Sequence, residues 1–131
     1  MADMMQFDLV SPEKMLASAR VRAVDLPAAE GDMTAMPDHA PMVVTLRPGI
    51  LRAEGEGETL EYVVTGGFVE INAGAVSVLA ETAHERGSVS REEIEALKRA
   101  AEERAAAAEA DDRDAVEKLV ADFVHLLDAM D

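Results

Sequence analysis

The sequence predicts an α+β protein, with an N-terminal antiparallel β-sandwich followed by a C-terminal antiparallel two-helix hairpin. All five prolines and all eight glycines fall within residues 1–87. Residues 88–131 contain neither, and Ala, Glu and Arg dominate there. Because Pro and Gly interrupt helices and mark turns, this change predicts a β domain at 1–87 and a helical domain at 88–131.

Short apolar segments separated by turn residues are the predicted strands of the first domain. They cover residues 6–10, 20–26, 42–46, 50–54, 59–65, 68–72 and 75–80. Many short strands at close spacing are typical of a sandwich or a barrel. No helical crossover lies between them, which argues against a parallel sheet.

Residues 30–49 are dense in turn-forming residues. Pro37, Pro41 and Pro48 each lack a backbone donor and fix φ, so no helix crosses this run. Gly31 and Gly49 are positions where the backbone can turn with positive φ.

Three later glycines predict further backbone features. Gly74 lies in residues 71–76, a pattern typical of a hairpin turn. Gly66 and Gly67 lie between two predicted strands and precede no helix, so they offer no helix N-terminus to a phosphate. This pair predicts a bulge or a close approach of two backbones.

The second domain begins with a helix-start signal. Ser90 and Glu93 match the capping box, which predicts a helix over about residues 91–110. Asp111 or Asp112 is expected to cap a second helix, and the short connection predicts an antiparallel hairpin. The apolar face of the first helix is Ile94, Leu97, Ala101, Ala105 and Ala108, and that of the second is Val116, Leu119, Val120, Phe123, Leu126, Leu127 and Met130.

The second helix carries more apolar surface than the Ala-rich face of the first can cover. The excess must pack on the β domain or on another protein. The sequence leaves these two alternatives open.

Composition excludes several classes of partner. The chain has 131 residues, 49% of them hydrophobic, and a net charge of −15. This charge argues against nucleic acid and against direct binding to an anionic membrane. Aromatic residues are scarce, and the eight Met residues are expected mainly to fill gaps in the core rather than to form an adaptable surface.

The sequence also indicates where in the cell the protein is expected to lie. With no Cys, disulfides and thiolate chemistry are excluded. The first residues match neither a secretory signal nor a transit peptide, and no apolar run approaches the ~20 residues that span a bilayer. We therefore expect a soluble cytoplasmic protein with no direct membrane insertion, associated with membranes only through a partner.

No arrangement of residues predicts catalysis or a bound metal. The chain lacks a nucleophile elbow, a phosphate-binding loop and a dinucleotide motif, and His39, His84 and His125 have no zinc-ligand spacing. His39 has no accompanying nucleophile, so it is expected to order its loop or to touch a partner. The acidic cluster Asp111, Asp112 and Asp114 lacks the Gly and distal Glu of a calcium loop, which favours helix capping.

Three phrases resemble the ε subunit of F-type ATP synthases: FDLVSPEKMLAS at 7–18, EGDMTAMPDHAPMVVTLRPG at 30–49 and VVTGGFVEINAGAVSVLAETA at 63–83. The resemblance spans nearly the whole chain, including its two-part layout. It implies a ten-stranded β-sandwich with a two-helix hairpin, in a non-catalytic subunit of the central stalk. The sandwich would bind the rotating γ subunit and the ring of c subunits, and so couple proton-driven rotation to ATP synthesis.

The resemblance also implies contact sites and a location. The family's ring-facing loop matches Glu30, Gly31 and Asp32, and its γ-facing surface matches Pro37, His39, Ala40 and Pro41. In regulated members the hairpin extends along γ to the catalytic α and β subunits. The expected location is the cytoplasmic face of the bacterial inner membrane, where the complex holds the subunit peripherally.

One motif departs from the family pattern. Some members bind ATP at Ile/Leu-Asp-x-x-Arg-Ala, and the matching stretch here contains Ile94, Glu95, Lys98 and Arg99. Glu replaces Asp, and Lys lacks the planar fork of Arg, so no nucleotide or other cofactor is expected. The second helix has only Arg113 and Lys118 as cations, so strong self-inhibition is not expected either.

Two functional hypotheses remain beside one another. The first is a non-catalytic, mechanical rotor subunit, in which the C-terminal helices could also regulate ATP hydrolysis. The alternative is chiefly a nucleotide- or energy-sensing inhibitor of the ATPase. A small β-sandwich enzyme or ligand-binding module is a third class, but it would need converging polar groups that the sequence does not contain.

Overall fold

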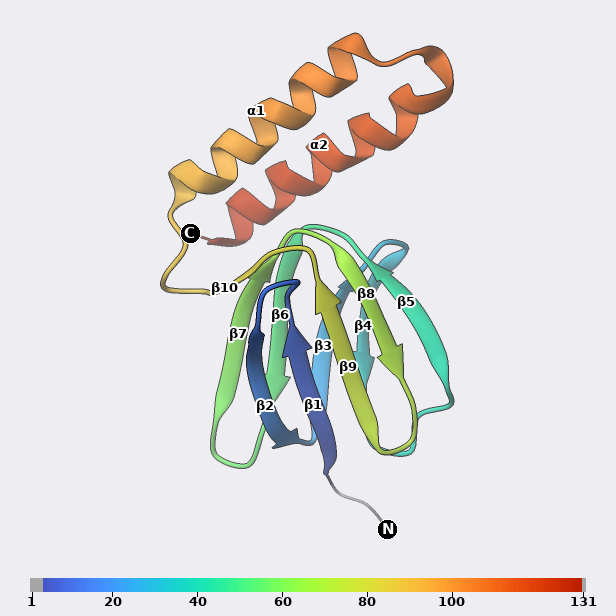
Figure 1. Ribbon diagram of the computed structural model, residues 1–131, viewed down its shortest axis with the longest axis vertical. Helices are drawn as coiled ribbons and strands as arrows, with labels where there is room; N and C mark the ends of the chain where they lie inside the picture. The colour runs from blue at the N-terminus through green and yellow to red at the C-terminus, as the bar shows by residue number, and fades with distance from the viewer. Residues whose placement is uncertain (1–3, 131) are drawn as a thin grey trace.

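The computed structural model describes residues 4–130 and has ten strands followed by two helices (Figure 1). Residues 1–3 and 131, at the outer ends of the two predicted domains, lie outside the described residues. The strands are β1 (Met5–Val10), β2 (Met15–Val21), β3 (Ala23–Ala28), β4 (Gly31–Ala35), β5 (Met42–Leu46), β6 (Gly49–Glu54), β7 (Thr59–Val64), β8 (Gly67–Ile71), β9 (Ala75–Ala80) and β10 (Ala83–Glu85). The helices are α1 (Arg91–Ala107) and α2 (Ala110–Met130).

The strands form two layers. The front layer in Figure 1 has the order β5-β8-β9-β1-β2, and the back layer has the order β4-β3-β6-β7-β10. A single pairing, Ala28 with Leu46, joins β3 to β5 and links the two layers at one seam. The predicted β-sandwich is therefore confirmed.

Alternation along the strands builds the core between these layers. Phe7 and Leu9 on β1 are fully buried, as are Val69 on β8 and Leu51 on β6. Their neighbours in sequence point outward, which is the period of two expected of a half-buried strand. Aliphatic side chains fill this core, with Phe7 and Tyr62 its aromatic members.

The structure corrects the prediction of one strand over residues 20–26. That segment contains the end of β2 and the start of β3, with a bend at Arg22 whose N–H donates to Glu54 O (2.8 Å). The strands β4 and β10 were not predicted, because β4 lies inside the turn-rich run and β10 has only three residues.

The sandwich is antiparallel as predicted except in one ladder. Strands β1 and β9 are parallel, with Phe7 opposite Val76 and Leu9 opposite Val78. The other ladders in the described chain are antiparallel. Parallel neighbours are usually connected by a crossover helix. Here the chain between β1 and β9 instead forms strands in both layers of the sandwich.

Two glycine predictions have different outcomes. Gly67 has a φ of +132°, and a Cβ there would lie 2.1 Å from Leu79 O, which confirms the close backbone approach. Gly31 also has positive φ. Gly49, the other position where positive φ was predicted to be accessible, does not adopt it. It provides space instead, because a Cβ there would lie 2.6 Å from the Pro27 Cβ atom.

The capping box of α1 is confirmed, with Ser90 Oγ accepting from Glu93 N and the Glu93 carboxylate accepting from Ser90 N. The predicted N-cap of α2 is wrong, because the helix already begins at Ala110 and places Asp111 and Asp112 in its first turn. There the two carboxylates still favour the positive end of the helix dipole.

The hairpin packs on the sandwich, which resolves the alternatives for the stripe of α2. Phe123, Leu126 and Leu127 are buried in a second cluster with Val63 of β7, and Ile50 of β6 packs at its edge. Val63 faces away from the sandwich core, so β7 is apolar on both faces where α2 covers it. The β domain itself covers the excess apolar surface.

The methionines do not mainly fill the core. Among the methionines at residues 4–130, Met5 is fully buried, whereas Met15, Met36 and Met42 are 58%, 56% and 43% exposed. The expected role of Met as core filler is therefore wrong for these three residues.

Candidate functional site

The loop between β4 and β5 carries the predicted site around His39. Asp38 N donates to Ala73 O (2.8 Å), which ties the loop to the β8–β9 turn. His39 Nδ1 donates to Ala40 O (2.7 Å), and His39 N donates to Met36 O (3.3 Å). The imidazole therefore orders its own loop, as one of the two alternatives predicted.

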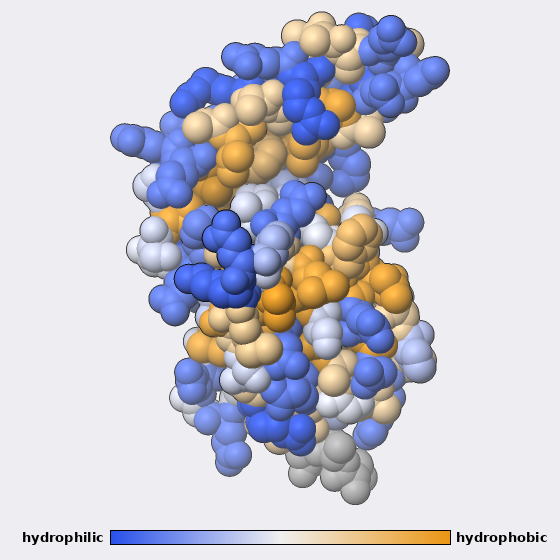
Figure 2. All heavy atoms as spheres, in the orientation of Figure 1, coloured by the Kyte–Doolittle hydropathy of each residue, from blue (hydrophilic) through white to orange (hydrophobic). Residues whose placement is uncertain are grey.

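An apolar ridge crosses the outer surface of the front layer. We use this name for Met15, Val10, Leu79 and Phe68, which lie opposite one another in neighbouring strands. Phe68 is 57% exposed and Leu79 is 58% exposed. Figure 2 shows the corresponding hydrophobic area over the upper parts of β8 and β9, below the hairpin.

A second group of exposed apolar side chains lies at the other end of the front layer, around the His39 loop and the start of β5. Val43 is 70% exposed, and Met36 and Met42 flank the loop on either side with exposed side chains. Six of the eight most exposed large hydrophobic residues of the described chain therefore belong either to the ridge or to this second group, and the other two lie on the helices. Thr45 and Glu70, opposite Phe68 and Val43, lie between the two groups. Exposed apolar side chains gathered in this way are typical of protein-binding sites.

A groove of about 960 Å³ separates the ridge from the hairpin. Phe68 and Leu79 lie on its sandwich side, and Arg104, Lys118 and Leu119 lie on its hairpin side. Lys118 Nζ is paired with Asp122 Oδ2 (3.1 Å). The groove thus continues the apolar ridge beneath the helices.

The predicted site at Glu30, Gly31 and Asp32 lies at the other end of the sandwich from the His39 loop. The turn itself contains only Ala29 and Glu30, because Gly31 and Asp32 already belong to β4. Ala28 beside this turn pairs with Leu46 at the end of β5, whereas the His39 loop precedes the start of β5. The two predicted contact sites are therefore separated by the length of a strand.

Arg47 braces this turn. Its guanidinium donates from Nη1 to Ala28 O and from Nη2 to Asp32 Oδ1. Arg47 N also donates to Pro27 O (2.9 Å), and Ala29 N donates to Thr45 O (2.8 Å). The β3–β4 turn and the β5–β6 loop are thus joined by side-chain and backbone bonds.

The four predicted regulatory positions on α1 do not share one role. Ile94 is buried in the cluster between hairpin and sandwich. Glu95 Oε1 pairs with Arg91 Nε (3.3 Å). Lys98 is half-buried and Arg99 is exposed. The isoleucine thus contributes to docking, while Glu95 is engaged within its own helix.

Arg86 connects the sandwich to the end of the hairpin. Its Nη1 donates to Glu61 Oε2 on β7 (2.9 Å), and its Nη2 donates to Ala129 O in the last turn of α2 (3.0 Å). Arg91 Nη1 similarly donates to Leu127 O (2.9 Å). These cations satisfy carbonyls at the negative end of the α2 dipole, where positive charge is favourable.

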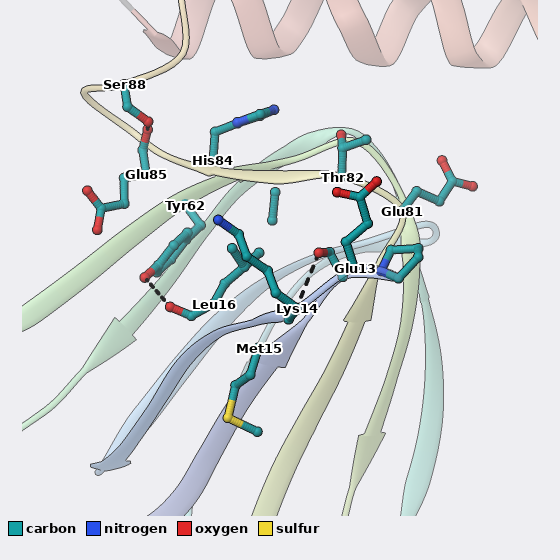
Figure 3. A pocket seen from close by; sticks show the side chains of 13 residues that line it. Glu13, Lys14, Met15, Leu16, Tyr62, Glu81, Thr82, His84, Glu85 and Ser88 are labelled. Carbon is teal, nitrogen blue, oxygen red and sulfur yellow. Dashed lines mark hydrogen bonds between the residues drawn. The ribbon is translucent and has the colours of Figure 1, made fainter.

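A cleft of about 620 Å³ lies between the β1–β2 turn and β10 (Figure 3). Glu13, Glu81 and Glu85 line it, but their carboxyl groups point in different directions. Tyr62 OH donates weakly to Leu16 O (3.4 Å), and burial, with a contribution from Glu85, raises the pKa of its phenol. The arrangement assembles no pair of nucleophile and base.

Within residues 4–130, no three His, Cys, Asp or Glu side chains are grouped to hold a metal ion. In the same part of the chain, neither helix is long and apolar enough to cross a membrane.

Comparison with known proteins identifies the family. The family model of the ATP synthase delta/epsilon chain β-sandwich domain matches residues 4–86. The chain belongs to the ATP synthase delta/epsilon chain family. It is 58% identical over 97 residues to the ATP synthase epsilon chain of Ruegeria sp., covering 74% of this chain and 71% of the relative. It is 49% identical over 132 residues to the epsilon chain of Paracoccus denitrificans, covering 100% and 88%.

A solved structure shares the fold. A chain of the cryo-EM structure of the Euglena gracilis mitochondrial ATP synthase superposes with a TM-score of 0.75. The match has 24% sequence identity and covers 98% of this chain and 82% of that chain. The resemblance drawn from the three sequence phrases is confirmed, as is the fold it implied.

Sequence reasoning missed the ridge and the two bracing arginines of this epsilon-family chain. Phe68 had a visible signal, because Val69 and Ile71 occupy the inward phase of β8 and leave Phe68 outside with Glu70. Arg47 and Arg86 had none, because their partners lie 15 to 43 residues away in sequence.

Proposed function

We propose that this chain is a non-catalytic subunit of the central rotor in a proton-translocating F-type ATP synthase. It joins the c-ring to the γ subunit, so that rotation of the ring reaches γ and drives ATP synthesis. The observation that carries this proposal is the apolar ridge, a solvent-exposed surface on a rigid double sheet. Membership of the epsilon-chain family supports the same role.

The γ subunit is the partner proposed for the front layer, which carries the ridge at one end and the His39 loop at the other. Met36 and Met42 flank the loop and give it adaptable apolar contacts. Bonds within the loop limit the entropy lost on docking. The γ-facing residues of this loop are Pro37, His39, Ala40 and Pro41.

The c-ring is the partner proposed for the turn at Glu30, Gly31 and Asp32. Exposed carboxylates at a turn can pair with Lys and Arg on the polar loops of a ring. Such pairs are individually modest and weaken with salt. A sandwich held on its front face by one partner and at the β3–β4 turn by another can transmit torque between them because its core is close-packed.

The rest of the proposal concerns chemistry and location. The chain works without a catalytic centre and without a cofactor, since its polar clusters brace loops and helix ends. It lies at the cytoplasmic face of the bacterial inner membrane, held there peripherally through γ and the ring. Residues 1–87 form the rotor-binding unit, and residues 88–131 form the hairpin that is available for regulation.

Regulation would use the hairpin in an undocked form. Its α1 positions Ile94, Glu95, Lys98 and Arg99 would then become available to the catalytic α and β subunits. The alternative function, chiefly an energy-sensing inhibitor of the ATPase, makes the same use of the hairpin. The buried cluster and the Arg86 contacts favour the docked form, and so favour the coupling role.

A pair of matched variants tests binding to γ. Phe68→Ser removes an exposed aromatic anchor from the ridge, whereas Leu97→Ser removes an exposed apolar side chain from α1 (42% exposed). Aromatic anchors often contribute 2 kcal/mol or more to an interface, so Phe68→Ser should weaken binding to γ about thirtyfold. If the two variants bind γ with equal affinity, the ridge is not part of the interface with γ.

Truncation separates the two functional alternatives. ATP hydrolysis by a catalytic subcomplex lacking this subunit is titrated with the full chain and with residues 1–87. For a coupler, both forms bind and neither slows hydrolysis. If only the full chain slows hydrolysis, the inhibitor alternative is correct. Failure of both forms to bind γ would refute the rotor proposal.

A further inference from the structure

Arg47 occupies an unusual position for a cation in an acidic chain. Its side chain is only 17% exposed, whereas the side chain of its partner Asp32 is 81% exposed. The guanidinium bonds to Ala28 O on one side of the β3–β4 turn and to Asp32 Oδ1 on the other. It therefore spans the base of the turn, and the exposed carboxylate rests on it.

This bonding leaves acidic oxygens facing solvent. Asp32 uses Oδ1 for Arg47, and within residues 4–130 no hydrogen bond or ion pair engages its other carboxylate oxygen. Glu30 lies at the tip of the turn and is exposed. Within residues 4–130, its side chain makes no hydrogen bond or ion pair. Gly31 between them has a φ of +141°, a conformation that L side chains rarely adopt. The turn thus presents two carboxylates from a backbone that Arg47 fixes.

We propose that Arg47 is the positioning residue of the ring contact: it holds the turn so that Glu30 and the free oxygen of Asp32 meet a basic loop of the c-ring. This inference rests on the proposed function of the turn. A bidentate guanidinium suits the task because its planar fork fixes two acceptors at once. A turn ordered before docking loses less entropy when it binds.

Charge and position predict opposite effects of removing Arg47, which makes the proposal testable. Glu30, Asp32 and Arg47 together carry a net charge of −1, and Arg47→Gln changes it to −2. If charge alone mattered, the variant would bind a basic ring more tightly. If Arg47 acts through position, the variant binds more weakly although the turn is more acidic.

The experiment measures binding of the full chain, in complex with γ, to detergent-purified c-ring at two salt concentrations. We expect Arg47→Gln to weaken ring binding three- to tenfold, and Arg47→Lys, which keeps the charge but lacks the planar fork, to restore only part of it. The effect should vanish in an Asp32→Asn background, since the pair acts as a unit. Arg52→Gln on β6 is the control, because it makes the same charge change at an exposed site away from the turn.

Hydrogen exchange of the isolated chain provides a second readout. Arg47→Gln should speed exchange in the peptide covering residues 27–33, where Ala29 N is bonded to Thr45 O, while α1 and α2 stay unchanged. Tighter or unchanged ring binding by Arg47→Gln would overturn the proposal. If the wild-type chain fails to bind the ring while exchange still depends on Arg47, the ring contact itself is wrong, and Arg47 only stabilises the fold.

Discussion

Substitution of Val63 tests how the hairpin is held on the sandwich. Val63 is fully buried, and its side chain joins the cluster of Phe123, Leu126 and Leu127 on α2. Val63→Ala removes two buried methyl groups, worth about 1.6 kcal/mol at ~0.8 kcal/mol each. The cavity left behind raises the cost to about 2–3 kcal/mol.

Most of this cost should fall on the docking of the hairpin, because Val63 points away from the main core. A loss of 2 kcal/mol corresponds to about a thirtyfold change in an equilibrium constant. We therefore expect amide exchange in α1 and α2 to accelerate about thirtyfold, while β1 and β9 keep their protection.

Val43→Ala is the matched control, since it removes the same two methyl groups from a strand valine that is 70% exposed. Val43→Ala should change the free energy of unfolding by no more than about 0.5 kcal/mol. Unchanged exchange in the helices of the Val63 variant would refute the reasoning. Equal acceleration in the helices and the sandwich would do so too, because it would make Val63 part of one cooperative core.

Three further changes have expected outcomes. Gly67→Ala should cost more than about 3 kcal/mol in thermal or urea unfolding, because its Cβ would collide with the backbone of β9, whereas Gly74→Ala, with no atom within 4 Å, should be nearly neutral. Burial raises the pKa of Tyr62, so its phenol absorbance should titrate above 10, and stability should fall as pH rises through that folded-state pKa. Hydrogen bonds from Gln6 and from a serine on β2 lower the pKa of Asp8, so Asp8→Asn should be destabilising at neutral pH.

Each of these outcomes has a contrary result. Equal stability of the two glycine variants would contradict the close approach at Gly67. A phenol titrating at or below 10 would contradict burial of Tyr62, and the assignment is direct because the chain has one Tyr and no Trp. The Asp8 contribution should be lost as pH falls through its lowered folded-state pKa, so a wild-type advantage over Asp8→Asn that persists below that pKa would contradict the hydrogen-bonded carboxylate.

Local signals predicted the helical part of the chain well. Ser90 and Glu93 marked the start of α1, and the spacing of Phe123, Leu126 and Leu127 identified the face of α2 that is buried. These features depend on neighbours within one or two turns, which a sequence displays directly. Family resemblance supplied what these signals lack, namely the number of strands and the kind of partner.

The less predictable features depend on distant residues. The break between β2 and β3 carries no Pro or Gly, and is set by the bond from Arg22 to Glu54, 32 residues later in the chain. The helix α2 begins at Ala110, earlier than predicted, because Glu109 O accepts from both Asp112 N and Arg113 N. Arg47 meets Asp32 only after three strands have paired. Such contacts form through tertiary structure, and no local pattern specifies them.

The parallel ladder between β1 and β9 has a consequence for biosynthesis. Strand β1 leaves the ribosome early, yet one of its two neighbours is encoded some 65 residues later. The front sheet can form completely only after residue 80 has emerged from the ribosome. Until then, β1 and β2 form a hairpin in which one edge of β1 is unpaired. A nascent chain stalled before β9 should therefore be sensitive to protease and engage chaperones. One stalled after β10 should already be resistant, with the helices still to be made.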